Sequence, residues 1–322
     1  KKIKKILIIR NDHIGDMIQA SCVFREIKKR YPKVKITVVA SNTNRQIIEK
    51  NKNIDEIILM PHGKKFFKNF RDYPKVLKKI KKEKFDKVLD LRGDVVNSFF
   101  LMFLTGIKSR AGFYRNPFIK IMNTYSQKRN DNITEVENML NIANKVLDLK
   151  STNFWPEIAI DNEEVKQAND FIKKNKLKKF ICIVPDSAHP LRQWPLKKFD
   201  TLIKQIRKNY PKYKIVLVGI DEGKINYLRN RNENLIWLGK CNLRMLLPFF
   251  KKSDLIITLD TGPMIFGWVS ETKLILLTLK ASIAGVNHGR PLGKNSFNII
   301  EDKKEIEVEE VMRFIKNAIK KN

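Results

Sequence analysis

The sequence predicts an α/β protein made of two Rossmann-like doubly wound domains that face a central cleft. The apolar runs at residues 6–9 and 255–259 are each followed by a tight turn and a further apolar stretch, a pattern typical of a strand, a turn and a helix. Each turn carries a carboxylate, Asp16 or Asp260, at the end of a strand where open α/β sheets bind ligands. The two junctions lie in separate halves of the chain and therefore predict one domain each.

Strand-like runs alternate with helical patterns along the whole chain, which favours βαβ units and parallel sheets. Strands are expected at residues 6–9, 35–40, 57–60, 87–91, 110–113, 180–184, 214–218, 235–237, 255–259 and 273–277. Helices are expected at residues 16–30, 95–105, 132–149, 196–209, 221–231, 243–252 and 305–320. Residues 95–105 are so apolar that we expect a buried helix packed on the sheet. Pro248 must kink or shorten the helix that contains it.

Length and composition set the broad class. The 322 residues suffice for two domains that each bury a core, and a turn-rich stretch at residues 150–156 predicts domains at residues 1–155 and 156–322. No apolar run reaches the ~20 residues needed to span a bilayer. The isolated Cys22, Cys182 and Cys241 indicate free thiols in a reducing compartment. We therefore expect a soluble cytoplasmic protein.

The formal net charge of +31 limits the partners to anions without naming one. The charge is spread along the chain, with a local concentration of lysines at residues 75–87. Such a field attracts nucleic acid, anionic lipid headgroups or a phosphorylated glycolipid. A lysine-rich solvated surface explains the same composition equally well.

Polar residues gather after the predicted strands of the second half and suit a bound nucleotide. Ser187 and Arg192 lie in a loop that could hold phosphate oxygens, and a carboxylate at residues 221–222 suits a ribose. Residues 260–262 present a hydroxyl and free N–H groups at a helix start. Each of these residues alone is more often a loop residue or a helix cap. Their concurrence in one half predicts an anion site.

Three stretches carry a resemblance to a known family. They are Ile-Arg-Asn-Asp-His-Ile-Gly-Asp-Met at residues 9–17, the Arg-Gln-Trp-Pro ending of residues 185–195, and Asp-Thr-Gly-Pro-Met at residues 260–264. In order and spacing the chain resembles the family 9 glycosyltransferases, which include the lipopolysaccharide heptosyltransferases. The resemblance implies a GT-B architecture with an acceptor domain first and a nucleotide-sugar domain second. It also implies that the last helix, about residues 305–320, packs back on the first domain.

The resemblance further implies an inverting transfer of a sugar, with heptose from ADP-heptose as the leading candidate. This transfer requires neither a metal nor another cofactor. Asp16 takes the position of the general base, and Arg10 is expected to face an anionic acceptor. The residues assigned to the donor are Ser187, Arg192, Glu222 with Asp221 as the alternative, Asp260, Thr261 and Gly262. The acceptor would be a lipopolysaccharide core or a related lipid-linked saccharide. The enzyme would then sit on the anionic inner face of the cytoplasmic membrane and bind no nucleic acid.

Two residues depart from the family's pattern. Ile265 stands where the family usually has His, so that His189 or Arg290 would have to replace the imidazole near the donor phosphates. Asp186 stands where Gly is common and adds a negative charge beside them. Two other classes stay open: a GT-B-like sugar-nucleotide epimerase, and a non-catalytic basic protein that binds anions or nucleic acid.

Overall fold

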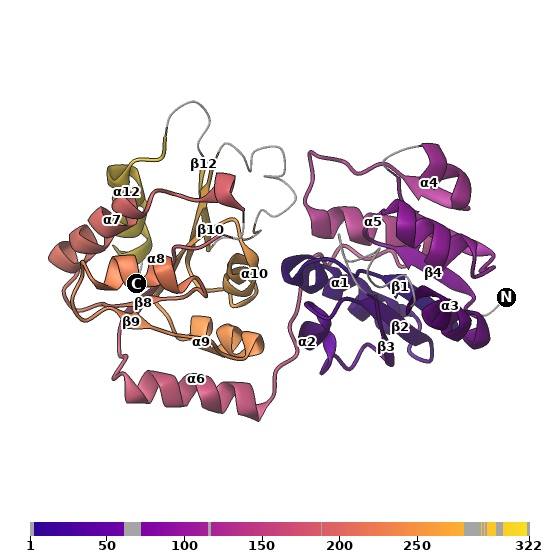
Figure 1. Cartoon of the computed structure of the whole chain (residues 1–322), viewed down its shortest axis with the longest axis horizontal. Helices are drawn as coiled ribbons and strands as arrows, with labels where there is room; N and C mark the ends of the chain where they lie inside the picture. Colours follow the sequence, from indigo (N-terminus) through magenta and orange to yellow (C-terminus); the bar gives the residue numbers. More distant parts are fainter. Residues whose placement is uncertain are drawn as a thin grey trace. The chain divides into compact units, whose positions relative to one another are not determined.

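The computed structural model describes residues 3–60, 72–114, 117–187, 189–279, 291, 293, 295–300 and 305–320. Arg290, considered above as a substitute for the imidazole, lies outside these residues. The chain divides into two compact units, Lys1–Ala159 and Ile160–Asn322 (Figure 1). The division falls a few residues after the boundary expected from the sequence.

The first unit is built on a parallel sheet with the strand order β3-β2-β1-β4-β5-β6. This is the order of a Rossmann fold, in which the direction of winding reverses between β1 and β4. The strands are β1 Lys5–Ile9, β2 Lys35–Ala40, β3 Glu56–Leu59, β4 Lys87–Asp90, β5 Ser109–Phe113 and β6 Tyr125–Gln127. The helices are α1 Ile14–Arg30, α2 Arg45–Ile48, α3 Asp72–Glu83, the π-helical segment η3 Asn97–Phe103, α4 Pro117–Met122 and α5 Glu135–Leu147.

The second unit repeats this arrangement, with the parallel order β12-β11-β10-β7-β8-β9. Its reversal point lies between β7 and β10, which pair in register from Ile181 with Leu255. The strands are β7 Phe180–Val184, β8 Lys214–Leu217, β9 Ile236–Trp237, β10 Leu255–Leu259, β11 Leu274–Thr278 and β12 Ser296–Ile300. The helices and 3-10 turns are α6 Asn162–Lys174, η4 Pro190–Arg192, α7 Leu196–Asn209, α8 Glu222–Arg229, η5 Leu243–Met245, α9 Leu246–Lys251, α10 Gly262–Val269 and α12 Val308–Lys320.

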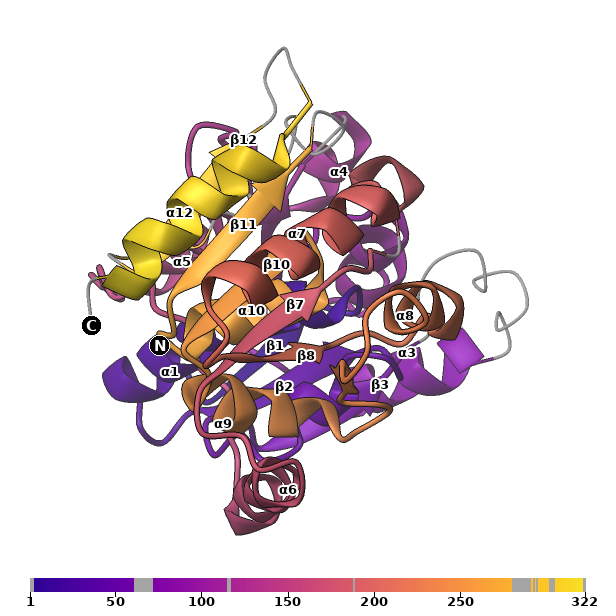
Figure 2. The same ribbon diagram turned by 90° about the vertical axis from the view of Figure 1, so that its left-hand side faces the viewer.

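The last helix packs within the second unit. In Figure 2, α12 lies beside α7 over the strands of that unit's sheet. Val311 and Ile315 are fully buried in one core with Phe199 of α7 and Ile275 of β11. The apolar face of α12 is therefore buried in the core of the second unit.

Two predicted helices differ from their expected form. The apolar residues 95–105 form the short segment η3, which buries Leu101 but leaves Phe103 49% exposed, because the sheet covers only one of its sides. The helix expected at residues 243–252 is split into η5 and α9. Pro248 then lies in the first turn of α9, where its missing N–H costs no hydrogen bond.

Candidate functional site

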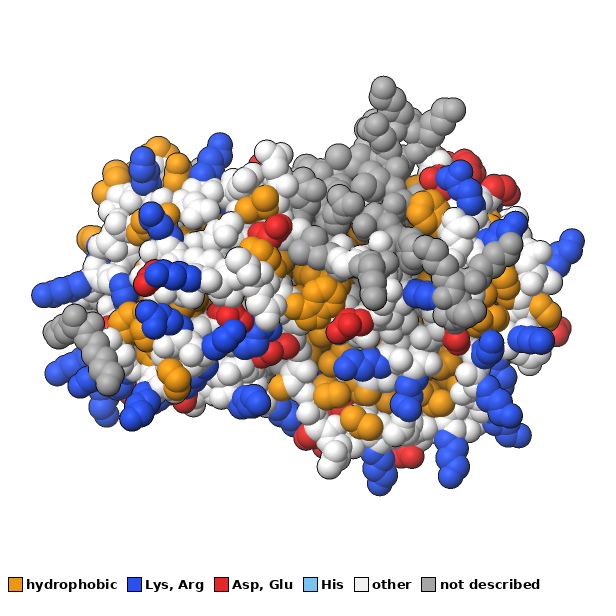
Figure 3. All heavy atoms as spheres, turned by 180° about the vertical axis from the view of Figure 1, so that it is seen from behind, with side chains coloured by type: hydrophobic (Ala, Val, Ile, Leu, Met, Phe, Trp, Pro, Cys, Tyr) orange, Lys and Arg blue, Asp and Glu red, His pale blue; other side chains and the backbone are white. Residues whose placement is uncertain are grey.

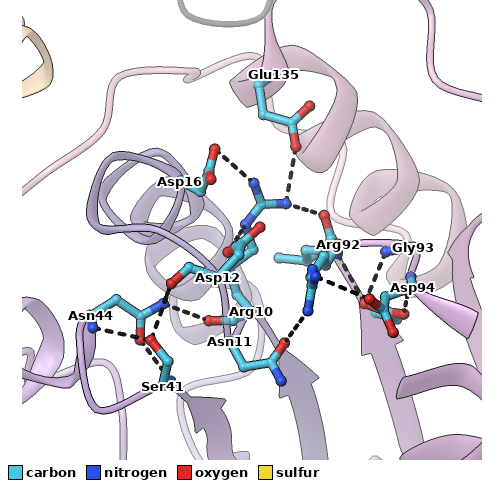
Figure 4. A network of polar contacts seen from close by, with 12 residues as sticks. Arg10, Asn11, Asp12, Asp16, Ser41, Asn44, Arg92, Gly93, Asp94 and Glu135 are labelled. Carbon is cyan, nitrogen blue, oxygen red and sulfur yellow. Dashed lines mark hydrogen bonds and ion pairs between the residues drawn. The ribbon is translucent and has the colours of Figure 1, made fainter. Parts of the chain in front are cut away.

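A buried arginine organises the carboxyl end of β1. Arg10 follows the last residue of the strand, and its side chain is only 2% exposed. Its guanidinium lies 3.1 Å from Asp12, 3.0 Å from Asp16 and 3.0 Å from Glu135, measured between nitrogen and carboxylate oxygen (Figure 4). It also donates to the carbonyl of Leu91. Arg10 therefore holds carboxylates together, whereas the family resemblance placed it facing an acceptor.

A second arginine balances part of this negative charge. Arg129 Nη2 lies 3.0 Å from Glu135 and donates to the carbonyl of Leu91 at 2.7 Å. Its guanidinium also stacks over the ring of Phe113, with 4.4 Å to the ring centroid. Glu135 thus bridges Arg10 and Arg129. Because Glu135 is buried and contacts both guanidinium groups, the bridge restricts the orientation of Arg10.

Of the three carboxylates around Arg10, only Asp16 can be reached from solvent. The side chain of Asp16 is 32% exposed, against 10% for Asp12 and 4% for Glu135. Asp16 lies in the first turn of α1, which begins at Ile14 after His13 as N-cap. Asp16 is therefore not the N-cap of α1, and its carboxylate is held by the guanidinium of Arg10.

Burial and neighbouring charges shift the pKa values of Asp12 and Arg10. Removal from water raises the pKa of Asp12 to about 6, against the attraction of Arg10, and repulsion from Asp16 adds to the rise. Burial opposes the charge of Arg10, but the carboxylates of Asp12, Asp16 and Glu135 raise its pKa, so it stays cationic. The net effect is a permanently charged arginine that faces a carboxylate able to titrate near neutral pH.

The turn between β1 and α1 is fixed by its neighbours. The amide of Asn44 donates to the carbonyl of Arg10 at 3.0 Å, and Ser41 Oγ donates to that of Asp12 at 3.1 Å. Asn11 and Asn97, the first residue of η3, donate to each other at 3.3 and 3.0 Å. These bonds satisfy the backbone of the turn and preorganise the position of Asp16.

In the second unit, two residues expected at the donor site form an ion pair. Arg192, at the end of η4, lies 3.0 Å from Asp260, which follows β10. The side chains are 36% and 20% exposed, and Arg192 Nε is buried without a hydrogen-bond partner. Asp260 therefore supports Arg192 directly, and the guanidinium keeps hydrogen-bonding capacity for a further acceptor.

The start of α10 is open on one side, although Pro263 has no N–H and that of Met264 donates to the carbonyl of Thr261 at 3.1 Å. Thr261 is the N-cap with an extended backbone, and its hydroxyl makes no capping hydrogen bond. A Cβ atom built on Gly262 would meet no atom within 4 Å, so this side of the turn is open. Ile265, one turn further, is 3% exposed and packs in the core. Where the family usually has an imidazole, this chain thus has a core residue.

Ser187 belongs to a loop that is closed on itself. Its N–H donates to Gln193 Oε1 at 3.3 Å, its Oγ accepts from the N–H of His189 at 3.3 Å, and it is 7% exposed. Gln193 in turn donates to the carbonyl of Pro185 at 2.6 Å. The loop after β7 therefore has a defined shape before any ligand binds.

A lysine that the sequence analysis overlooked neutralises Asp186. Lys224 Nζ lies 2.8 Å from Asp186, 2.8 Å from Gln193 Oε1 and 3.4 Å from Asp221. Burial opposes the charge of Lys224, but Asp186 and Asp221 raise its pKa. The extra negative charge of Asp186 is thus already paired. The position of Lys224 in the first turn of α8 could have indicated this pairing from the sequence. A cation is unfavourable at a helix N-terminus unless nearby carboxylates pair with it.

The two ribose candidates have different surroundings. Asp221 is the N-cap of α8, and it accepts from the N–H of Lys224 at 3.2 Å, which lowers its pKa. Glu222 has a 58% exposed side chain and lies 3.4 Å from Lys240. Both carboxylates are exposed, but Asp221 caps its helix and Glu222 does not.

The described residues contain no group of three or more His, Cys, Asp and Glu side chains arranged to hold a metal ion. Over the same part of the chain, no helix combines the length and apolarity needed to cross a bilayer.

Comparison with known proteins gives consistent similarities. A family model described as glycosyltransferase family 9 (heptosyltransferase) matches residues 74–304. The chain is 28% identical over 276 residues to lipopolysaccharide heptosyltransferase 1 of Campylobacter coli, covering 80% of this chain and 79% of that one. The structure resembles a family 9 glycosyl transferase of Veillonella parvula, with a TM-score of 0.85, 20% identity and coverage of 99% and 98%. Heptosyltransferase II of E. coli superposes with a TM-score of 0.79, 18% identity and coverage of 98% and 99%.

Proposed function

Because the chain belongs to glycosyltransferase family 9, we propose that it transfers a heptose from ADP-heptose to a lipopolysaccharide core. The protein is a glycosyltransferase with a GT-B fold. The donor and acceptor are inferred from its relatives, among them the heptosyltransferase of Campylobacter coli. The family match favours transfer over the two alternatives, a sugar-nucleotide epimerase and a non-catalytic anion-binding protein.

One observation carries the proposed mechanism. Asp16 is a partly exposed carboxylate held 3.0 Å from a buried arginine at the carboxyl end of β1. In an inverting transfer, an acceptor hydroxyl attacks the anomeric carbon while the bond from that carbon to the phosphate oxygen breaks. Asp16 takes the hydroxyl proton, and the nucleoside diphosphate leaves with the bonding electrons. Arg10, 3.0 Å from Asp16, orients its carboxylate for this step.

The second unit supplies the donor site in this proposal. Arg192 and the N–H of Gly262 at the start of α10 neutralise the diphosphate, as guanidinium groups and helix N-termini do elsewhere. Asp260 holds Arg192 in place, while Thr261 and Ser187 add hydroxyl groups. Glu222 accepts from the ribose hydroxyls in this proposal, because its side chain is 58% exposed and does not cap α8, whereas that of Asp221 accepts from the N–H of Lys224.

Replacing Asp16 tests the proposal. Asp16→Asn keeps the size of the side chain but removes the base, so we expect turnover with ADP-heptose to fall ~10²–10⁴-fold. ADP binding, followed by the shift in melting temperature, should stay unchanged. Asp170→Asn on the exposed surface of α6 is the matched control and should keep full turnover. Full turnover in Asp16→Asn would remove Asp16 from the mechanism, and a melting shift only with UDP or GDP would change the donor.

A further inference from the structure

Net charge alone does not locate the surface that meets an anionic partner. On the face shown in Figure 3, Lys and Arg side chains are scattered, with Asp and Glu between them. Exposed apolar side chains are more selective, because soluble proteins rarely gather them without a function. Among the residues that the structure describes, eight large apolar side chains are exposed, and five of them come from a short part of the first unit: Val95, Phe99, Phe103, Phe118 and Ile121.

These side chains come from two adjoining elements. Phe99 and Phe103 are 36% and 49% exposed on η3, and they stack on each other. Phe118 and Ile121 are 71% and 81% exposed on α4, which packs against η3. The helix α4 buries Ile119, so that Phe118 and Ile121 lie outside the core. We call this set the η3–α4 surface.

The charge of the same segment has one sign. Residues 95–130 form the longest stretch of the chain without Asp or Glu, and they contain six Lys and Arg residues. Lys108, Lys120 and Lys128 are exposed, and Arg110 lies 5.8 Å from the ring centroid of Phe103. Exposed aromatic and aliphatic side chains among cations are the composition of a surface that enters the headgroup region of an anionic bilayer.

The η3–α4 surface is also joined to the candidate catalytic residues. Its first helical residue, Asn97, donates to Asn11 Oδ1 at 3.0 Å, and Asn11 directly follows Arg10. A membrane contact through η3 would therefore hold the part of the unit that carries Asp16 near the surface where a lipid-linked acceptor lies. This step rests on the proposed function.

We propose that the η3–α4 surface docks the enzyme on an anionic phospholipid bilayer, with Phe118 and Ile121 inserted among the headgroups. The acceptor then needs to extend only its sugar part to Asp16. The charge complementarity of residues 95–130 selects an anionic bilayer over a neutral one, and the exposed side chains supply the apolar contact.

The test measures binding of the full chain to vesicles by co-sedimentation. Vesicles of phosphatidylcholine are compared with vesicles that also contain phosphatidylglycerol, and we expect binding only to the second. Phe118→Ser with Ile121→Ser should weaken binding about tenfold or more, since both side chains lose their apolar contact. The matched control is Leu191→Ser with Ile220→Ser, two residues that are 67% and 72% exposed in the second unit.

Charge is tested separately from insertion. Changing Lys108, Lys120 and Lys128 together to Gln should weaken binding about a hundredfold, at ~1 kcal/mol for each lysine near the membrane surface. Changing the exposed Lys173, Lys174 and Lys178 to Gln removes the same net charge elsewhere and should have a much smaller effect.

Three outcomes would overturn the proposal. They are equal binding to both vesicle types, equal losses in the surface variants and their controls, and a lipid-free dimer that the Phe118 and Ile121 changes dissociate in light scattering. The last outcome would make the surface an interface between two copies of the chain. ADP binding by each variant tests the donor site, so the surface and the proposed function can fail independently.

Discussion

Arg10, directly after β1, and Arg192, at the end of the loop segment η4 that follows β7, each pair with an aspartate at 3.0 Å. Their surroundings differ. Arg10 is buried among Asp12, Asp16 and Glu135, whereas the side chain of Arg192 is 36% exposed and pairs with Asp260. An arginine–aspartate pair is thus formed by a buried arginine in the first unit and by a partly exposed arginine in the second.

This difference teaches that burial decides what an arginine near a ligand site can do. A guanidinium that three carboxylates already surround cannot leave them without a large electrostatic loss, so it positions its partners. A guanidinium with one partly exposed partner loses little when that partner is exchanged for a phosphate. Arg10 therefore suits the orientation of a base, and Arg192 suits the binding of an anion.

The largest expected effect comes from making the same change in both units. Arg10→Met keeps the apolar stem but leaves three carboxylates without their cation, so we expect a loss of ~3–5 kcal/mol in the free energy of unfolding. Arg192→Met should cost less than ~1 kcal/mol, because its pair is partly exposed. Urea denaturation of both variants measures the two losses, and similar values would break the comparison.

The pH dependence of stability sharpens the account of the buried cluster. Asp12 titrates near 3.8 in the unfolded chain and at about 6 in the folded protein, so between these values the folded state binds the extra proton. The contribution of Asp12 to the free energy of unfolding must therefore fall as the pH rises from ~4 to ~6. The Asp12→Asn variant cannot take up this proton. The difference in the free energy of unfolding between wild type and variant should therefore change by ~3 kcal/mol between pH ~4 and ~6.

Denaturation curves recorded at several pH values for both proteins measure this slope. The wild type should lose stability relative to the variant as the pH rises, never gain it. Parallel pH profiles would contradict a raised pKa for Asp12 and would reduce the electrostatic contrast between the two units.

The smallest expected effect concerns nucleotide binding. Arg192→Met should weaken ADP binding by ~1.5–3 kcal/mol, the usual range for a lost hydrogen bond to a charged group. Arg313→Met, on the exposed side of α12, is the matched control and should leave ADP binding unchanged. Calorimetric titration with ADP measures both, and an unchanged dissociation constant would assign Arg192 to the structure of its loop.

Much of the fold was predictable because it depends on local patterns. Apolar runs such as residues 6–9 and 255–259 predicted buried strands, and the family resemblance predicted the GT-B fold, which the structural comparison confirms. The π-helical form of η3 was not predictable, since its composition matches that of a buried helix. Whether Phe103 is covered depends on which elements pack beside it, and the sequence of the segment does not contain that information.

The site was predictable only in part. Asp16 and Arg10 are close in sequence, and their proximity followed from one turn. Glu135 lies more than a hundred residues from Arg10, and Lys224 reaches Asp186 across two loops, so neither pair has a local signal.

The sequence by itself determined the α/β class, the two strand–turn–helix junctions and the residue types at their ends, because these follow from periodicity and turn chemistry within a few residues. The tertiary structure alone decided which charges are buried together. It enclosed Arg10 with Glu135, left Asp16 accessible and paired Arg192 with Asp260. The physical reason is that burial and electrostatic pairing depend on distances between elements, which are set only when the sheets and helices pack.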